Sequence, residues 1–331
     1  MTQSASTTVA DLKEGEKVSG TFLCKRKSAS SDRNGRQFLS LVLSDYTGEV
    51  EALLWERVDE QAAEFEAEDP VTVAGKVMLF QGRRQLHLRK IRKAGADERP
   101  VEELHPASSL DITQVLEDVT SLLLGMTPGP LRHLAQAYLG DEPLMARLVR
   151  APAARSIHHA HTGGLLEHTL SVMRLTAAIC GHYSQALPGL LNRDLCLMGA
   201  FLHDLGKVEE ISAEGGFNYT TPGRLLGHLL LGLRELDQKI ASQPDFPQDL
   251  ADHLRHLLAA HHGRLEHGSP KLPMTAEALV LHRADELDSS LASLRDLFRQ
   301  TGEGEWTAYQ PHMERYFFKG GESGEGGGSS L

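Results

Sequence analysis

Histidine and aspartate side chains recur along the second half of the chain, each inside an otherwise apolar stretch. A polar group in that setting faces a packed interior or a cleft, and a buried imidazole or carboxylate needs a partner. Several such groups from separate segments can satisfy one another by sharing divalent metal ions. The stretches are GGLLEHTLSVM with His168, FLHDLGK with His203 and Asp204, GRLLGHLLLG with His228, LLAAHHGRLEHG with His261 and His262, and LVLHRADELDSS with Asp285.

Each of these residues taken singly also has an ordinary structural explanation. A lone histidine on an apolar face, such as His228, is commonly a hydrogen-bonded core residue. His261 and His262 could instead end a helix before Gly263, where positive imidazoles are stabilised. The joint occurrence of all five stretches favours the metal site. We expect structural or surface roles for the neighbouring histidines His158, His159, His161, His256, His267 and His282.

Net charge and histidine content divide the 331-residue chain into unlike halves. Residues 1–95 carry 15 Lys and Arg against 14 Asp and Glu, a net charge of +1. The overall net charge is −11, so residues 96–331 have a net charge of −12. Of the 17 histidines, 14 follow residue 157. Acidic and imidazole side chains together suit divalent cations, so we expect the metal chemistry in the second half.

The composition, with 40% hydrophobic and 24% charged residues, is that of a globular protein and not of a disordered one. No apolar run approaches the roughly 20 residues that a membrane span needs, and the first residues lack a secretory signal. We therefore expect a cytoplasmic protein with no membrane partner. The cysteines Cys24, Cys180 and Cys196 form no CxxC pair, so we expect neither a disulfide framework nor a thiolate zinc site.

Residues 16–93 have the pattern of short strands, rich in Val, Leu and Phe and separated by Gly, Asn and Asp. The predicted strands are 16–29, 36–45, 48–55, 69–80 and 83–93, with a predicted helix over 56–68. Three strands, a helix and two further strands is the order of a five-stranded OB-fold β-barrel. The pattern therefore predicts that fold for the N-terminal part of the chain.

Basic residues cluster at two turns of this predicted barrel, as on a surface that binds single strands of nucleic acid. The residues that we predict as weak nucleic-acid contacts are Lys25, Arg26, Arg36, Arg83 and Arg84. Aromatic residues between them are candidates to stack on bases, namely Phe22, Phe38, Trp55 and Phe80. The alternative is that these rings fill the barrel and that the charges only solvate it.

Beyond the barrel the apolar period changes to that of helices, from DITQVLEDVTSLLLGM to about residue 300. The final stretch GGESGEGGGSSL is too glycine-rich to fold. We therefore predict a multidomain α+β protein with a β-barrel followed by an all-α domain. Its predicted parts are a barrel over 10–95, a linker over 96–110, a helical domain over 111–318 and a disordered tail over 319–331.

The histidine and aspartate pattern resembles that of a known family, the HD-domain metal-dependent phosphohydrolases, which are helical. Their H…HD…D signature is matched here by His168, His203, Asp204 and Asp285. A strand barrel followed by GGLLEHTLSV, HDLGK, YTTPGRLLGH and LHRADELDS is similar to the YhaM-type 3′-5′ exoribonucleases over roughly residues 10–320. This combination is far more specific than the HD pair alone.

The resemblance implies a site for two divalent metal ions. One ion would be held by His168, His203, Asp204 and Asp285, and the other by His228, His261 and His262, with Asp204 bridging the two. Imidazole and carboxylate ligands suit manganese, the first choice, with Fe, Co, Mg or Zn as alternatives. Two such ions can bind a phosphate and activate a water, so the ligand Asp204 is also expected to be catalytic.

Lys207 is the second expected catalytic residue. It lies four residues after His203, hence on the same face of a continuous helix, and could stabilise charge on phosphoryl oxygens. The alternative is a surface lysine that makes a helix-end contact. Arg224, in a loop expected at YTTPGR, is a weaker candidate for a phosphate contact.

The resemblance implies a metal-dependent exoribonuclease that acts on single-stranded RNA. It leaves open whether single-stranded DNA is also a substrate and whether the protein forms a homo-oligomer. One alternative is an HD phosphohydrolase of small nucleotides. Against it, the GYP motif of cyclic-di-GMP hydrolases is absent after HDLGK, and a barrel would be superfluous for a mononucleotide. The other alternative is a nucleic-acid-binding protein without catalysis, which the filled ligand positions disfavour.

Overall fold

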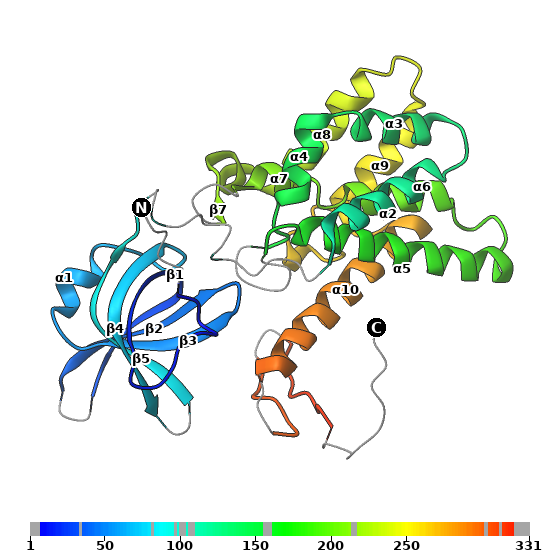
Figure 1. Cartoon of the computed structure of the whole chain (residues 1–331). Helices are drawn as coiled ribbons and strands as arrows, with labels where there is room; N and C mark the ends of the chain where they lie inside the picture. Colours follow the sequence, from blue (N-terminus) through cyan, green and yellow to red (C-terminus); the bar gives the residue numbers. More distant parts are fainter. Residues whose placement is uncertain are drawn as a thin grey trace.

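The chain forms an N-terminal β-barrel and a C-terminal bundle of helices (Figure 1). The computed structural model describes residues 7–32, 35–80, 83–95, 98, 104, 110–154, 161–212, 217–300, 304–310 and 313–320. Most of the predicted linker over 96–110 and residues 321–331 of the predicted tail lie outside these ranges, as do His158 and His159. The predicted domain limits therefore stay predictions.

The barrel is closed and has the strand order β1-β2-β3-β5-β4. Its elements are β1 (Lys17–Ser31), β2 (Gln37–Asp45), β3 (Gly48–Leu54), α1 (Val58–Ala62), β4 (Pro70–Phe80) and β5 (Arg83–Lys93). Strand β1 pairs with both β2 and β4, and β3 runs parallel to β5, which closes the sheet on itself. Closure leaves no open sheet edge and confirms the predicted OB-fold order.

Alternation of apolar residues places one face of every barrel strand in a common interior. Along β2, for example, Leu39, Leu41 and Leu43 are buried at every second position. The ring of Phe22 lies in the same interior and has no exposed surface. The prediction that Phe22 stacks on bases is therefore wrong, because this ring fills the barrel instead.

The helical part contains α2 (Ile112–Leu124), α3 (Pro130–Leu139), α4 (Glu142–Arg150), α5 (Gly164–Ala186), α6 (Arg193–Leu202), α7 (Lys207–Glu210), α8 (Thr221–Ala241), α9 (Gln248–Ala260) and α10 (Ala276–Gln300). Two short strands, β6 (Ile211–Ser212) and β7 (Asn218–Tyr219), pair between α7 and α8, and η2 (Leu265–His267) follows α9. Several helices begin at side-chain caps, which satisfy free amide groups of the first turn. Asp111 accepts from Thr113 N at 2.9 Å, and Asn192 accepts from Leu195 N at 3.0 Å.

Helix α6 is the centre of the bundle. Every residue from Leu195 to Leu202 is buried, as expected for a helix that is apolar on all sides. A Cβ at Gly199 would lie 2.6 Å from Leu257 Cδ1, so glycine allows α9 to pack closely against α6. The His203–Asp204 pair follows directly at the end of this helix and is therefore held in the interior.

After α10 the chain folds back on itself in an irregular hairpin, residues 304–310 and 313–320. Isolated bridges join Trp306 to Phe318 and Gln310 to Arg315. This hairpin was not predicted, because the sequence indicated only helix before the glycine-rich tail. Among the described residues, none of the helices is long and apolar enough to cross a membrane.

Candidate metal centre

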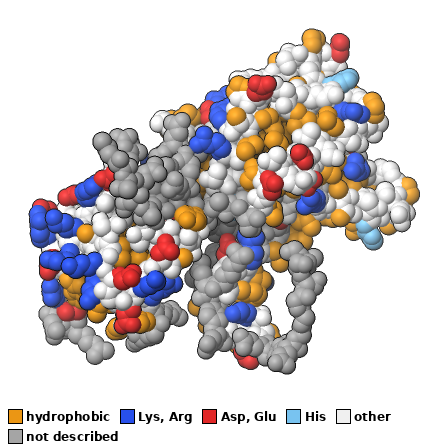
Figure 2. Space-filling view, in the orientation of Figure 1, with side chains coloured by type: hydrophobic (Ala, Val, Ile, Leu, Met, Phe, Trp, Pro, Cys, Tyr) orange, Lys and Arg blue, Asp and Glu red, His pale blue; other side chains and the backbone are white. Residues whose placement is uncertain are grey.

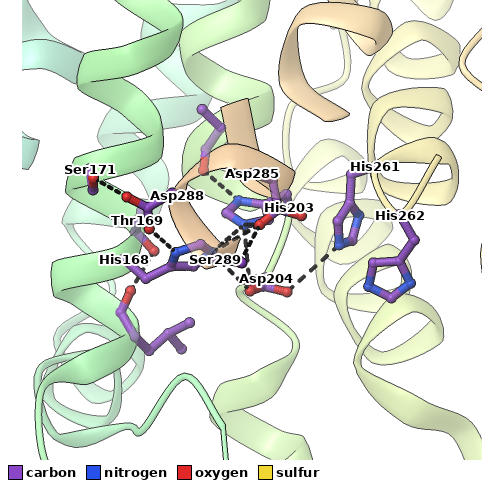
Figure 3. Close-up of polar contacts among 12 residues, drawn as sticks. His168, Thr169, Ser171, His203, Asp204, His261, His262, Asp285, Asp288 and Ser289 are labelled. Carbon is purple, nitrogen blue, oxygen red and sulfur yellow. Dashed lines mark hydrogen bonds and ion pairs between the residues drawn. The ribbon is translucent and has the colours of Figure 1, made fainter. Parts of the chain in front are cut away.

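Five segments of the helical domain bring imidazole and carboxylate groups to one place. Figure 3 labels all of these side chains except His228. Helix α5 supplies His168, the turn after α6 supplies His203 and Asp204, and α10 supplies Asp285. Helix α8 supplies His228, and the turn after α9 supplies His261 and His262. All seven predicted metal ligands therefore lie together, although 117 residues separate the first from the last.

The first triad consists of His168, His203 and Asp285, with candidate ligand atoms all within 4.8 Å of one another. The Nε2 atom of His168 lies 3.2 Å from the Nε2 atom of His203 and 3.2 Å from Asp285 Oδ1. Both histidines are almost completely buried. Two imidazoles and a carboxylate thus face one small volume that the surrounding helices shield from solvent.

The outer nitrogens of this triad have fixed partners. His203 Nδ1 donates to Ala200 O at 2.8 Å, and His168 Nδ1 contacts Asp288 Oδ2 at 2.7 Å. Ser171 donates in turn to the other oxygen of Asp288. With the ring protons on Nδ1, the Nε2 lone pairs of the two histidines point at each other, an arrangement that a shared cation stabilises.

The second triad consists of His228, His261 and His262. The Nε2 atoms of His228 and His262 are 3.2 Å apart, and His261 Nδ1 donates to Leu258 O at 2.8 Å. The inward Nε2 atom of His261 is buried and has no hydrogen-bond partner among the described residues. A buried acceptor of this kind costs free energy unless something binds it, so these residues too fit a cation.

The carboxylate of Asp204 lies between the two triads. Its Oδ2 atom is 3.4 Å from His203 Nε2 and 3.5 Å from His168 Nε2. Its Oδ1 atom is 3.4 Å from His228 Nε2 and 3.7 Å from His261 Nε2. Each oxygen therefore faces a different triad, which is the geometry of a carboxylate able to bridge two ions.

Burial and charge separate the pKa values of the two triads. Burial lowers the pKa of His168, but hydrogen bonds to Asp285 and Asp288 outweigh it and raise the pKa to about 9. Burial, with the neighbouring His261 and His228, lowers the pKa of His262 to about 3. In the metal-free protein, His168 therefore holds a proton at neutral pH, whereas His261 and His262, whose pKa values burial lowers, offer neutral imidazoles.

Close approach between backbones fixes the second triad relative to the first. A Cβ at Gly206 would lie 2.1 Å from the carbonyl oxygen of His228, so the turn after Asp204 admits only glycine there. Gly227 interrupts α8 with a φ of 73°, which directs His228 toward the centre. The Glu210 carboxylate then holds His228. Its Oε1 atom accepts from the backbone N of His228 at 3.1 Å, and its Oε2 atom lies 3.3 Å from His228 Nδ1.

A further histidine supports the turn after α9. His282 Nδ1 donates to the carbonyl oxygen of His261 at 2.9 Å, and the ring packs against Gly263, where a Cβ would lie 2.0 Å away. Gly263 has a φ of 77°, a left-handed conformation that favours glycine. His282 thus has a structural role, as expected, because its ring positions the turn that carries His261 and His262.

Comparisons with known proteins agree with both halves of the structure. Residues 18–94 match the family model of the OB-fold nucleic acid binding domain, and residues 165–290 match that of the HD domain. The 3′-5′ exoribonuclease YhaM of Bacillus velezensis is 35% identical over 92% of this chain and 95% of its own length. The chain belongs to the YhaM family of 3′-5′ exoribonucleases.

Other relatives extend the same similarity. The 3′-5′ exoribonuclease YhaM of Listeria monocytogenes is 33% identical over 90% of this chain and 93% of its own length. The protein of the same name from Bacillus subtilis is 32% identical over 92% of this chain and 95% of its own length. The predicted fold class and family are confirmed, and the HD domain implies that this chain binds divalent metal.

Lys207 does not lie where the sequence suggested. Helix α6 ends at Leu202, a turn covers residues 203–206, and Lys207 begins α7, so the premise of one continuous helix face is wrong. The Lys207 ammonium instead pairs with Asp204 Oδ2 at 2.7 Å. Burial opposes the charge on Lys207, but Asp204 outweighs it and raises the pKa of the lysine.

Three residues of the centre were not predicted, namely Ser171, Glu210 and Asp288. Asp288 follows Asp285 by three residues in ADELDSS, so the two carboxylates share one face of α10. That spacing was a usable signal, because a metal-ligating histidine usually donates its other ring nitrogen to an acceptor. Glu210 and Ser171 had no comparable signal, since their partners come from distant segments.

The predicted nucleic-acid contacts of the barrel differ in their exposure and in their partners. Lys25 pairs with Glu49 at 2.7 Å, and Arg84 donates to Leu12 O at 3.0 Å, whereas Arg26 is exposed. Arg36 lies over Trp55 at 5.5 Å, and Trp55 stacks on Phe38 at 4.5 Å.

The two remaining predicted contacts are Arg83 and Arg224, and the remaining candidate for base stacking is Phe80. The side chain of Arg83 lies outside the described residues, and Arg224 is exposed in the first turn of α8 and not in a loop. The ring of Phe80 is exposed at the end of β4. Figure 2 shows basic and acidic side chains mixed over the barrel. These contacts stay predictions.

Proposed function

We propose that this chain is a metal-dependent 3′-5′ exoribonuclease that hydrolyses phosphodiester bonds of single-stranded RNA. The observation that carries the proposal is the pair of triads, His168–His203–Asp285 and His228–His261–His262, that both face Asp204. A site of this kind has the ligands for two divalent ions, and the HD domain and the YhaM relatives point to phosphodiester hydrolysis. Single-stranded DNA is a second substrate class under the same proposal.

The ligand set favours ions that accept nitrogen donors. Five imidazoles and two carboxylates converge, whereas Mg²⁺ is usually bound through carboxylates, phosphates and water. We propose manganese first, with iron, cobalt or zinc preferred over magnesium. Two such ions, when bound, polarise a phosphoryl oxygen and lower the pKa of a bound water.

The protein groups around the two triads hold the ligands in place. Asp288, Ala200 O and Leu258 O bind the outer nitrogens of His168, His203 and His261. The rings therefore need little reorganisation when an ion binds. Lys207, partly buried and paired with Asp204, places a positive charge beside the site, where it can stabilise an anionic substrate.

The barrel supplies the other half of the proposed reaction. Its OB-fold and nearly neutral charge suit a polyanionic strand better than the acidic helical half does. We propose Lys25, Arg26, Arg36, Arg83 and Arg84 as weak contacts to the strand. Residues 10–95 would hold RNA while its 3′ end reaches the centre in residues 111–318.

The experiment is degradation of 5′-end-labelled single-stranded RNA by the purified protein with manganese, with and without a chelator. We expect stepwise shortening from the 3′ end, abolished by the chelator and by His203→Ala or Asp204→Ala. His267→Ala removes an exposed histidine of η2 and is the matched control, which should retain activity. Shortening that survives the chelator would contradict the proposal, and hydrolysis of mononucleotides alone would favour the alternative HD activity.

A further inference from the structure

The hairpin after α10 exposes four aromatic rings. The side chains of Trp306, Tyr309, Tyr316 and Phe318 are 58%, 47%, 60% and 55% exposed. The hairpin backbone is held by Thr307 N donating to Phe317 O at 2.9 Å and Lys319 N donating to Glu305 O at 2.7 Å. These residues lie outside both family-model matches, which cover 18–94 and 165–290.

The rings are arranged in two cross-strand pairs. Trp306 and Phe318 have ring centroids 4.9 Å apart, and Tyr309 and Tyr316 have centroids 5.2 Å apart. This packing orders the rings while about half of each remains open to solvent. Clustered exposed aromatic rings are costly in water and mark a surface that binds something.

Charge around the rings is compatible with a polyanion. The described residues of the hairpin carry two basic side chains, Arg315 and Lys319, and two acidic ones, Glu305 and Glu314. The hairpin is therefore neutral, whereas the rest of the helical half is strongly acidic. Both basic residues belong to the segment 313–320, which also carries Glu314, Tyr316 and Phe318, so this segment has a net charge of +1 and can contact a phosphate backbone.

The hairpin is tied to the metal centre by one helix. Helix α10 carries Asp285 and continues to Gln300, shortly before the hairpin, and Figure 1 shows the hairpin at the far end of α10. Fifteen residues of α-helix span about 22 Å. The end of α10 thus lies roughly that far from Asp285 along the helix axis, and the hairpin follows it in the chain.

We propose that this hairpin is a base-stacking platform that holds single-stranded RNA upstream of the 3′ end being cut. The inference rests on the proposed function of the centre. Stacking on aromatic rings accepts any base, which an enzyme that shortens RNA without regard to sequence requires. A stacked strand rises about 3.4 Å per nucleotide, so a strand has to be about six or seven nucleotides long to span the distance.

This length requirement defines the test. The double variant Trp306→Ala/Tyr316→Ala should bind a hydrolysis-resistant phosphorothioate strand of about 20 nucleotides about tenfold or more weakly in the manganese-loaded full chain. Its kcat/KM on RNA of that length should fall by a similar factor. Cleavage of RNA of about three nucleotides, too short to reach the hairpin, should be unchanged.

Matched variants separate stacking from folding. Trp306→Phe/Tyr316→Phe keeps both rings and should keep wild-type affinity. Tyr183→Ala removes an exposed ring from α5, far from the hairpin in sequence, and should also bind as the wild type does. Light scattering on every variant gives the oligomeric state.

Three results would overturn the platform. The first is unchanged affinity for the long strand, and the second is an equal loss of activity on short and long RNA, which means damage to the centre. The third is a change in oligomeric state with unchanged RNA affinity, which makes the rings a contact between copies. Absence of any cleavage by the wild type would refute the proposed function, whereas a ring-dependent loss of affinity would still support the platform.

Discussion

At the scale of single residues, the orientation of three imidazoles is set on the side away from the proposed metal positions. The outer contacts are backbone carbonyls for His203 and His261, and a carboxylate for His168. Substitution cannot remove a backbone carbonyl, but it can remove the carboxylate of Asp288. Asp288, like Glu210 beside His228, is therefore a position where the effect of ligand orientation is open to measurement.

Asp288→Asn should weaken metal binding by about 10- to 100-fold, because it removes the negative charge that orients and strengthens His168 as a ligand. Ser171→Ala should act in the same direction and less strongly, since Ser171 only orients Asp288. Metal content after dialysis and titration with manganese give the affinity. Asp296→Asn on the same helix is the control, and an equal loss in that variant would show that the effect is not specific to the centre.

The raised pKa of His168 gives the metal-free protein a defined pH dependence. Its pKa is 6.5 in the unfolded chain and about 9 in the fold, so protonation stabilises the fold fully below pH 6.5. That contribution, roughly 3 kcal/mol, is lost as the pH rises through 9. Thermal unfolding with a chelator should therefore show a Tm that falls between pH 6.5 and 9.

Manganese should reverse this trend, because a metal ion competes with the proton on His168 and binds more tightly as the pH rises. The difference in Tm between loaded and metal-free protein should widen over the same range. A metal-free Tm that stays constant or rises between pH 6.5 and 9 would contradict the assigned protonation. His168→Asn should remove the dependence.

At the scale of elements, glycines determine how closely the segments that carry ligands can meet. Gly206 brings the turn after α6 against the backbone of α8, and Gly199 brings α9 against α6. Both contacts bring separately folded helices to one centre. The glycine of the HDLGK stretch is therefore part of the geometry of the site, although it binds nothing itself.

Gly206→Ala should separate α8 from the turn, because its Cβ would lie 2.1 Å from His228 O. We expect a loss of stability of about 2 kcal/mol or more and weaker metal binding at the second triad. Calorimetry and metal content measure the two effects. Gly181→Ala in α5 is the matched control, since its Cβ would meet nothing within 4 Å and should stabilise the helix by about 0.5–1 kcal/mol.

Some helices and strands could be predicted from sequence patterns, and others could not. Apolar alternation predicted all five barrel strands, and the helical period predicted α2, α3 and α4, since each pattern reflects burial of one face. The break after Leu202 was missed, because FLHDLGK continues the helical period across a turn. The hairpin at 304–320 was missed too, because its rings pack in pairs across strands and follow no burial pattern.

At the scale of the molecule, the two parts contribute different chemistry to the proposed reaction. The barrel has nearly balanced charge, whereas the helical part is acidic and contains every residue of both triads. The sequence predicted all seven triad and bridging residues because the family signature names them. The supporting contacts had to come from the structure, because they depend on which atoms of distant segments meet.

Arg26→Ala tests the contribution of the barrel. The exposed guanidinium is proposed to contact a phosphate, so its loss should weaken RNA binding for all sequences alike and reduce the slope of log Kd against log salt by about one. Binding of a phosphorothioate strand at several salt concentrations gives the slope. Arg57→Ala is the control, because Arg57 is already paired with Glu60, and an unchanged slope for Arg26→Ala would exclude that contact.

The fully buried helix α6 has a consequence for how the centre can come apart. Its eight consecutive buried residues cannot become solvent-exposed by local fraying, so its amide hydrogens should exchange with solvent only when the whole bundle unfolds. His203 and Asp204 follow this helix directly. Both triads face Asp204, so the carboxylate that joins them should keep its place until the domain as a whole unfolds.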